Sequence, residues 1–408
     1  MEFYQSPPFV VVVGADVGKR SHHLFAVDAA SGEVLLDEGV ANREADIRAA
    51  LGRLAGRGPA AVVSDQPGPL SATLFACARS LGIAARFITP AAMHAVLRAS
   101  DPDRKDDAWD ARIIAETACG SPRLVKEPRR RNLQLAALLE LRRIDSAEKA
   151  ALQNRLHDRM LSESPAFEAA VSRLGLGSGL ALMIMSRWGG PLALRRCGRA
   201  NLRRAVLAVP GMGPAAAARA DAVFDAALSQ ATLGEGAEQA EAVVRELAGR
   251  LAACLARLED RGAEIADALA AEPAAAVLMS MPGVGPVTAA TFLAEVGDAS
   301  GFRSADALAH YAGLSPKRAE SGASLDSSSK STSCNRRLRS AMVLAANSAR
   351  EVAGSPSAAY YERRRRPDEL GRREGHYHAL MALARKMIGV MWAMLRDGTE
   401  YEWRMPAA

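Results

Sequence analysis

Cysteine and aromatic residues are scarce in this chain of 408 residues, and a long hydrophobic run is missing. The five cysteines are odd in number and never stand in C-x-x-C spacing, which argues against a disulfide framework and a thiolate zinc site. A reducing cytoplasm is therefore the default compartment. No signal peptide is predicted, because no basic region precedes the short apolar run at the N-terminus. The run 387–395 is too short to span a bilayer, which takes ~20 residues, so no membrane partner is expected.

Lysine is also rare, since it supplies only seven of the 52 basic residues. Arginine therefore carries the net charge of +6, and its planar guanidinium suits phosphate oxygens. The 49% hydrophobic and 24% charged residues exclude a disordered chain. The length predicts two or three domains. With aromatics at only 5% and abundant Ala, Leu and Arg, helices are expected to dominate.

Residues 1–130 have the pattern of an α/β domain. Apolar β-branched runs predict strands, and amphipathic segments between them predict helices. The expected strands are 9–14, 22–28, 33–40, 60–64 and 84–89, and the expected helices are 43–54, 71–81 and 106–118. Three strands followed by alternating helix and strand predict a mixed sheet. A basic stretch around 123–131 marks the end of this domain.

Residues 131–272 are predicted to form a helical arm with an insertion. Apolar residues recur near 3.5-residue spacing over 132–161, which indicates a long, coiled-coil-like helix. A second long segment, 236–270, could return antiparallel to it. The part between, 165–235, is helical with Pro and Gly breaks. Residues 273–408 form a third, mainly helical domain.

A weak internal repeat links the arm to the last domain. The segment 206–215 (VLAVPGMGPA) resembles 277–287 (VLMSMPGVGPV). Each reads as a helix, a Pro-Gly-x-Gly turn and a second helix, and such helix-hairpin-helix elements offer backbone N–H groups to a phosphate. The alternative is a tight turn between two core helices. We favour that alternative for the first copy and leave both interpretations open for the second.

Four acids are candidate metal ligands. They are Asp16 at the end of the first strand, Asp65 after the fourth strand, and Asp107 and Asp110, three apart on one helix. Strand ends converge in a mixed sheet, and four clustered carboxylates need cations between them to stay ionised. Hard oxygen ligands favour Mg²⁺ or Mn²⁺. Taken singly, each acid is a loop or cap residue, which is how we interpret the neighbouring Asp101, Asp103 and Asp106.

A second candidate site lies in a Ser/Gly-rich loop. Ser321 precedes Gly322, and arginines stand on both sides of the loop. A serine hydroxyl in such surroundings could attack phosphorus once its proton is removed. Composition alone favours a plain surface linker. The run 363–366 is four arginines, and it is expected to contact a phosphate backbone.

In their order along the chain, these segments resemble insertion-sequence transposases with an N-terminal RuvC-like (RNase H-like) DEDD domain and a C-terminal serine-bearing domain, a family that includes the bridge-RNA-guided recombinases. The resemblance covers roughly 9–160 and 275–400. It is carried by GADVGK at 14–19, KDDAWDA at 105–111, MPGVG at 281–285, Phe302, YAGLSP at 311–316, SG at 321–322 and NRRLR at 335–339.

The resemblance assigns roles to residues. It implies that the DEDD quartet is Asp16, Asp65, Asp107 and Asp110, and that Ser321 is the nucleophile, with Ser324 a minor rival. This chain departs from the pattern at Asp65, where the family usually has Glu, and at Cys334, where it has Gly. Nucleic-acid contacts are expected from the basic residues Lys105, Arg318, Arg336, Arg337, Arg339, Arg363, Arg364, Arg365 and Arg366.

The resemblance further implies a DNA transposase or recombinase that forms a covalent serine–DNA intermediate. Donor and target DNA would be its substrates, Mg²⁺ or Mn²⁺ its cofactor, and a structured RNA from the element its guide. A composite site would be shared between protomers of a dimer or tetramer, with the arm at 132–161 as the oligomerisation element. Such an enzyme acts on the nucleoid in the bacterial cytoplasm.

Two rival functions stay open at this stage. One is a RuvC-like junction nuclease that uses the four acids and a water nucleophile. The other is a non-catalytic DNA-binding protein. Loss of the covalent adduct on changing Ser321 separates the recombinase from the nuclease, and a response to divalent metal separates both enzymes from the binding protein.

Overall fold

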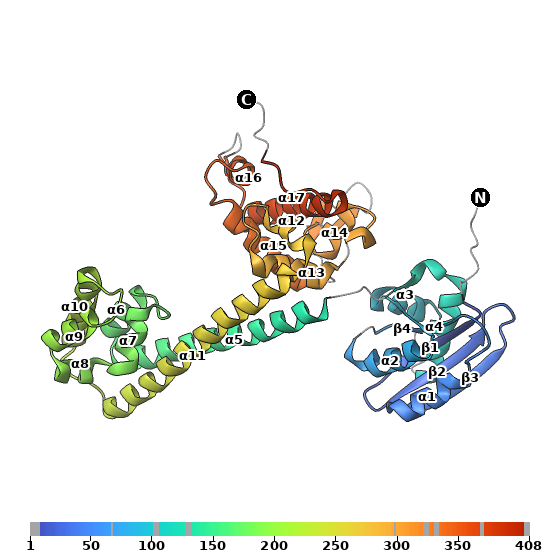
Figure 1. The fold of residues 1–408 in the computed structure, drawn as a ribbon, viewed down its shortest axis with the longest axis horizontal. Helices are drawn as coiled ribbons and strands as arrows, with labels where there is room; N and C mark the ends of the chain where they lie inside the picture. The colour runs from blue at the N-terminus through green and yellow to red at the C-terminus, as the bar shows by residue number, and fades with distance from the viewer. Residues whose placement is uncertain are drawn as a thin grey trace. The chain divides into compact units, whose positions relative to one another are not determined.

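The computed structural model describes residues 9–66, 68–100, 106–127, 132–297, 299–315, 317–320, 326–329, 334–367 and 371–403. The chain divides into two compact units, Met1–Arg130 and Arg131–Ala408. The N-terminal unit is a mixed α/β domain, and the second unit is built almost entirely from helices (Figure 1).

The N-terminal unit is organised around a six-stranded sheet with the order β3-β2-β1-β4-β5-β6. Its strands are β1 (Val11–Val17), β2 (Ser21–Asp28), β3 (Val34–Ala41), β4 (Ala60–Ser64), β5 (Ala84–Ile88) and β6 (Val125–Lys126). The first three strands form an antiparallel meander, β1, β4 and β5 run parallel, and β6 closes the far edge antiparallel. The predicted mixed sheet is therefore confirmed, and β6 is an addition that the sequence pattern did not indicate.

Helices cover both faces of this sheet. Alternate residues of β1 point to opposite faces, so Val11, Val13 and Ala15 pack with α1 (Glu44–Gly52) and α2 (Ala72–Ser80). Val12 on the opposite face packs with α3 (Pro90–Ser100) and α4 (Asp107–Gly120). Helix α3 was not predicted. The short helices η1 (Pro69–Ser71) and η2 (Pro122–Leu124) complete the unit.

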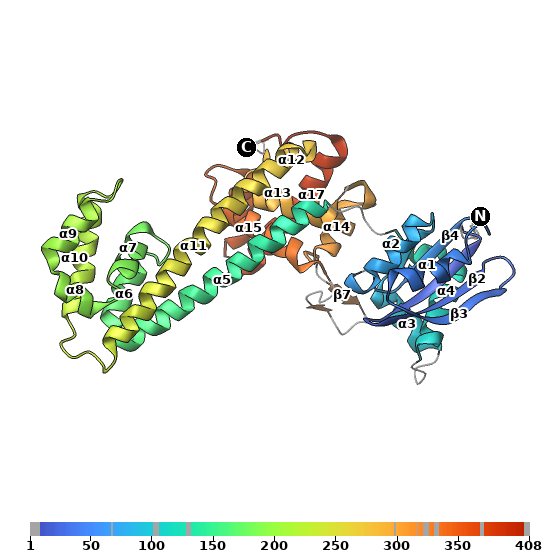
Figure 2. The same cartoon turned by 60° about the horizontal axis from the view of Figure 1, so that its bottom comes forward.

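The second unit is built on two long helices, α5 (Leu133–Glu163) and α11 (Ala237–Ala270). They lie side by side and run antiparallel (Figure 2), as expected for 132–161 and 236–270. Coiled-coil packing stays a prediction for this pair. Since α5 packs on a helix of its own chain, much of the apolar face that suggested an oligomerisation arm is used within one protomer.

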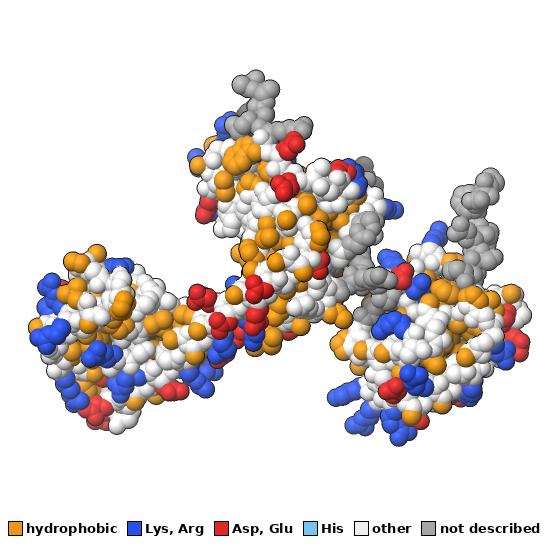
Figure 3. Space-filling model, viewed as in Figure 1, with side chains coloured by type: hydrophobic (Ala, Val, Ile, Leu, Met, Phe, Trp, Pro, Cys, Tyr) orange, Lys and Arg blue, Asp and Glu red, His pale blue; other side chains and the backbone are white. Residues whose placement is uncertain are grey.

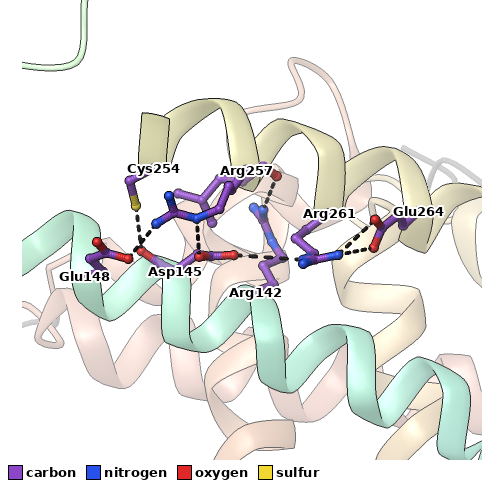
Figure 4. A network of polar contacts seen from close by, with 8 residues as sticks. Arg142, Asp145, Glu148, Cys254, Arg257, Arg261 and Glu264 are labelled. Carbon is purple, nitrogen blue, oxygen red and sulfur yellow. Dashed lines mark hydrogen bonds and ion pairs between the residues drawn. The ribbon is translucent and has the colours of Figure 1, made fainter. Parts of the chain in front are cut away.

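A polar network fixes how α5 and α11 face each other (Figure 4). Asp145 on α5 is buried and accepts a 3.0 Å hydrogen bond from Arg257 on α11. Arg142 reaches across to the carbonyl oxygen of Leu258 at 2.9 Å, and Cys254 donates to the carbonyl oxygen of Asp145 at 3.2 Å. A buried charge needs its partner, so these contacts disfavour a shifted register.

Each end of the long pair carries a hydrophobic core. The first, which we call the middle subdomain, gathers Leu152 and Leu156 of α5, Val244 and Leu251 of α11, and five intervening helices. These are α6 (Pro165–Arg173), α7 (Gly179–Arg187), α8 (Pro191–Cys197), α9 (Arg199–Leu207) and α10 (Pro214–Leu228). The predicted insertion at 165–235 is therefore a folded helical subdomain.

The second core belongs to the C-terminal domain, and Leu135 of α5 and Ile265 of α11 contribute to it. The elements here are α12 (Pro273–Met279), α13 (Pro286–Val296), η3 (Ala299–Gly301), α14 (Ala305–Tyr311), the hairpin β7 (Lys317–Glu320) and β8 (Asp326–Ser329), α15 (Arg336–Ala349), α16 (Pro356–Arg365) and α17 (His376–Asp397). By length and composition α17 could cross a membrane. Its Met387, Ile388 and Met391 are buried in this core.

Candidate active site and nucleic-acid contacts

Two of the four candidate acids leave the sheet at the same edge. Strands β1 and β4 are parallel, and Ala15 pairs with Ser64. Asp16 follows the first of these paired residues and Asp65 follows the second. Because the carboxyl ends of parallel neighbours meet at one edge, the two side chains are brought together.

The other two acids reach this edge through a close helix contact. Asp107 and Asp110 stand in the first turn of α4, which lies on the face of β1 that carries Val12, Gly14 and Asp16. A Cβ atom on Gly14 would lie only 2.0 Å from the carbonyl oxygen of Ala111. Glycine is therefore required here, and its absent side chain lets the start of α4 approach the end of β1. The N-cap of α4 is Asp106, whose side chain accepts from Ala108 N and Trp109 N, so its interpretation as a cap residue is confirmed.

Three of the four carboxyls have raised pKa values, and neighbouring acids contribute to each shift. Burial raises the pKa of Asp16 to about 6, helped by the negative charges of Asp107, Asp65 and Asp110. Burial also raises the pKa of Asp65, with a further contribution from Asp110. The pKa of Asp110 is raised by burial and then by Asp107. Mutual repulsion of this kind is the environment that a bound cation relieves.

The chemistry of these side chains fits a hard divalent cation. All four offer carboxylate oxygens, and Oδ1 of Asp65 is buried without a hydrogen-bond partner. Among the described residues, no lysine or arginine contributes to the pKa shifts of Asp16, Asp65 and Asp110. In the part of the chain that the structure describes, no three acid, histidine or cysteine side chains lie close enough together to bind one metal ion. The acids are neighbours in one electrostatic site, and ligation requires them to draw closer together.

A polar cluster in the C-terminal domain ties three helices together. Asn335 caps α15 by accepting from Leu338 N at 3.0 Å. Its side-chain amide donates to Glu295 of α13 at 2.7 Å and to the Tyr311 hydroxyl of α14 at 2.9 Å. Glu295 also pairs with Arg337 at 2.6 Å. Since Tyr311 and Asn335 flank the segment 312–334, this cluster brings the two ends of that segment together.

Comparison with known proteins identifies the family. A DEDD transposase model of the IS110 group, described as Transposase, matches residues 13–165, and one described as Transposase IS116/IS110/IS902 family matches residues 275–362. An uncharacterized 43.6 kDa protein of insertion element IS110 from Streptomyces coelicolor is 35% identical over 402 residues, which are 97% of this chain and 96% of that protein. The chain belongs to the IS116/IS110/IS902 transposase family. The predicted resemblance to insertion-sequence transposases is thus confirmed.

Two further relatives of this transposase differ in coverage. An uncharacterized 44.8 kDa protein of insertion element IS116 from Streptomyces clavuligerus is 33% identical over 395 residues, 94% of each chain. A pilin gene-inverting protein of Moraxella bovis is 31% identical over 132 residues, 32% of this chain and 39% of its own length. Membership of the family implies an enzyme that cuts and recombines DNA, and its DEDD domain indicates use of a divalent metal.

The arginines predicted to contact nucleic acid have different surroundings in this transposase. Arg337 is held by Glu295, and Arg339 lies against Cys334, with 2.6 Å from its guanidinium to Sγ. Arg336 is exposed at the first turn of α15 and has no acidic partner among the described residues. On α16, Arg364 makes two hydrogen bonds to Glu374 of 2.7 and 2.6 Å.

Four residues singled out from the sequence fall at or beyond the limit of what the structure describes. Ser321 and Lys105 lie outside the described residues, as does the rival Ser324, and Arg318 is described as backbone alone within β7. Their assigned roles stay predictions.

The sequence analysis missed Glu295, although a signal for it exists. In the helix PVTAATFLAEV this is the one charged residue, and an acid in so apolar a segment is rarely buried without a partner. It also missed the part that Gly14 plays in bringing α4 to the acids. Glycine inside a buried strand is the corresponding signal for a close backbone approach.

Proposed function

We propose that this transposase cuts and rejoins DNA strands through a covalent Ser321–DNA intermediate, using Mg²⁺ or Mn²⁺ bound by Asp16, Asp65, Asp107 and Asp110. The observation that supports the proposal is the shared electrostatic environment of these acids where β1, β4 and α4 adjoin, since Asp107, Asp65 and Asp110 all raise the pKa of Asp16. Sequence motifs scattered over almost a hundred residues contribute to one electrostatic site, as a DEDD assignment requires.

The chemistry needs a nucleophile as well as acids. The Ser321 oxygen attacks the phosphorus, a serine–phosphate bond forms, and the bond to the 3′ oxygen breaks. The hydroxyl proton leaves the serine, and the departing 3′ oxygen takes up a proton. A different 3′ hydroxyl then attacks the phosphoserine and releases the serine, so the number of phosphodiester bonds is conserved. A bound divalent cation would stabilise the charge on the oxygens around phosphorus.

Guidance by an element-encoded structured RNA and assembly into a dimer or tetramer belong to the same proposal. Both are supported by the resemblance stated above. An arginine-rich, lysine-poor composition suits an enzyme that holds phosphate backbones while base pairing selects the sequence. The Moraxella relative is named as a pilin gene-inverting protein, which supports rejoining of strands over simple hydrolysis.

The test uses an intact element with its flanking DNA on a plasmid, in cells that produce the protein. Wild-type protein is expected to yield recombined junctions and a protein–DNA adduct that survives denaturation and disappears with protease. Ser321→Ala and Asp16→Asn are each expected to lose both products, whereas Ser324→Ala serves as the matched control and keeps them. Recombination that persists in Ser321→Ala overturns the serine assignment. Cutting without an adduct in wild-type protein supports the water-using nuclease instead.

A further inference from the structure

The middle subdomain carries an excess of positive charge. Residues 164–236 contain eight arginines, no lysine and four acids, a net charge of +4 against +6 for the whole chain. Basic side chains gather on the visible face of this subdomain (Figure 3). A surface of this kind attracts polyanions, and none of the predicted catalytic residues lies in it.

Two acids of this surface form ion pairs with arginines of the same surface. Asp225 pairs with Arg199, and Asp221 pairs with Arg203 at 3.6 Å. These two pairs cross between α9 and α10 and set the register of the two helices as an antiparallel hairpin.

Two arginines of the hairpin remain without an acidic partner among the described residues. Arg204 on α9 and Arg219 on α10 are both exposed. The register set by the Arg203–Asp221 pair puts them at nearly the same level of the hairpin. Both side chains are exposed to solvent on separate helices, where they add to the positive field of the subdomain, and a field spread over two helices favours an extended polyanion over a small isolated anion.

The turn of this hairpin is exposed as well. Pro210, Gly211 and Gly213 are exposed, and nothing lies within 4 Å of a Cβ built on either glycine. In the second copy of the repeat, a Cβ on Gly283 would lie 2.5 Å from the carbonyl oxygen of Ala345. That copy is therefore used to pack α15. The first copy is a tight turn between the core helices α9 and α10, as favoured from the sequence, and this turn is exposed to solvent.

The distance between the middle subdomain and the C-terminal core indicates which polyanion could contact both. Val244 of α11 packs in the middle subdomain and Ile265 in the C-terminal core. Twenty-one helical residues at ~1.5 Å each separate them by about 32 Å. Duplex DNA rises by ~3.4 Å per base pair, so this distance is about one turn of the double helix. DNA bound near the C-terminal domain has to extend by about one turn to reach the middle subdomain.

We propose that the surface formed by Arg204, Arg219 and the 209–213 turn binds the phosphate backbone of duplex DNA that flanks the recombination site. The proposal rests on the DNA substrates implied by the family and is independent of the serine and of the guide RNA. Its contacts carry no sequence choice, since they go to phosphates rather than bases. The middle subdomain is then a DNA-holding element.

The experiment measures equilibrium binding of the full chain, without divalent metal, to duplex DNA of arbitrary sequence. The double variant Arg204→Gln/Arg219→Gln is expected to weaken binding to a long duplex and to lower the slope of log affinity against log salt by ~1.8, because each phosphate contact contributes about 0.9. The effect is expected to shrink on a duplex shorter than about 10 base pairs, which cannot reach both regions. Arg204→Lys/Arg219→Lys is expected to restore most of the affinity.

The matched control is Arg155→Gln/Arg159→Gln, which removes the same charge from exposed positions of α5. An equal loss in this control, or an unchanged salt slope in the test variant, overturns the proposal. A loss confined to a structured RNA of the same length also overturns it, in favour of an RNA surface. Metal-free binding does not depend on strand cleavage, so failure here leaves the serine mechanism untouched, and failure of that mechanism leaves this surface untouched.

Discussion

Single residues decide whether the candidate acids can work together. Gly14 has no catalytic group, yet the approach of α4 to β1 depends on it, because a Cβ atom would overlap Ala111 O and come within 2.6 Å of Ala115 N. The acids of α4 reach those of the sheet across this contact. A residue without a functional side chain therefore controls how closely α4 approaches the end of β1.

Gly14→Ala is expected to destabilise the N-terminal unit by about 1–3 kcal/mol, because overpacking forces the backbone apart. Recombination is expected to fall more steeply than stability, since Asp107 and Asp110 move away from Asp16. Denaturant unfolding and the plasmid assay measure the two effects. Gly52→Ala is the control, because nothing lies within 4 Å of its added Cβ. Full activity in Gly14→Ala would contradict this role.

The pKa of Asp16 also predicts a pH dependence. Its folded-state value of about 6 lies above the ordinary value of 3.8, so between these values the folded protein binds more protons than the unfolded chain. Stability of the metal-free protein is therefore expected to fall as pH rises through this window. In Asp16→Asn the fall should be shallower, with Asp65 and Asp110 leaving a residual slope. Hydrogen exchange of β1 amides in the presence of a chelator measures it. An unchanged slope would mean that Asp16 is not the group responsible.

At the scale of elements, α16 carries two kinds of arginine. Some are bound to Glu374, and others face outward. Arg364 is bound by the Glu374 carboxylate and Arg365 by the Glu374 carbonyl oxygen. Arg363 lies over the Tyr360 ring at 5.3 Å and stays exposed, and Arg366 is exposed at the end of the helix. The four arginines at 363–366 look alike in the sequence but differ in whether their side chains are bound within the protein.

Arg363→Gln/Arg366→Gln is expected to weaken binding to all DNA sequences alike and to reduce the salt slope by ~1.8. Arg364→Gln is the comparison, because it should lower thermal stability by freeing Glu374 and affect the salt slope less. Fluorescence anisotropy over a range of salt concentrations distinguishes the two. A sequence-selective loss in the double variant would point to base contacts instead.

At the scale of the whole molecule, the long helix pair leaves apolar side chains of α5 exposed. Leu141 and Ile144 of α5 remain 42% and 52% exposed, although other residues of that helix pack on α11 and on the two cores. Leu138 contacts the C-terminal core, so a helix-breaking change there would disrupt the fold itself. The predicted oligomerisation role is better tested at the exposed positions.

Leu141→Glu/Ile144→Glu is expected to shift the molecular mass in solution from a multiple of 43.1 kDa towards the monomer, because charge replaces exposed apolar surface. Light scattering after gel filtration measures the mass. Leu133→Glu is the control, since this leucine is 76% exposed at the start of the helix. An unchanged mass in the double variant would remove α5 from the oligomer interface.

The sequence alone determined the alternation of strands and helices before residue 130 and the two long helices, and it nominated four acids as candidate ligands, because periodicity and residue chemistry are local properties. It did not indicate α3, the buried role of Glu295, or which copy of the Pro-Gly-x-Gly repeat stays exposed. Those were decided by tertiary structure: α15 packs against Gly283, whereas nothing lies within 4 Å of a Cβ on Gly211, so two similar Pro-Gly-x-Gly turns differ in what packs against them. Contacts between segments far apart in the chain leave no periodic trace in either segment.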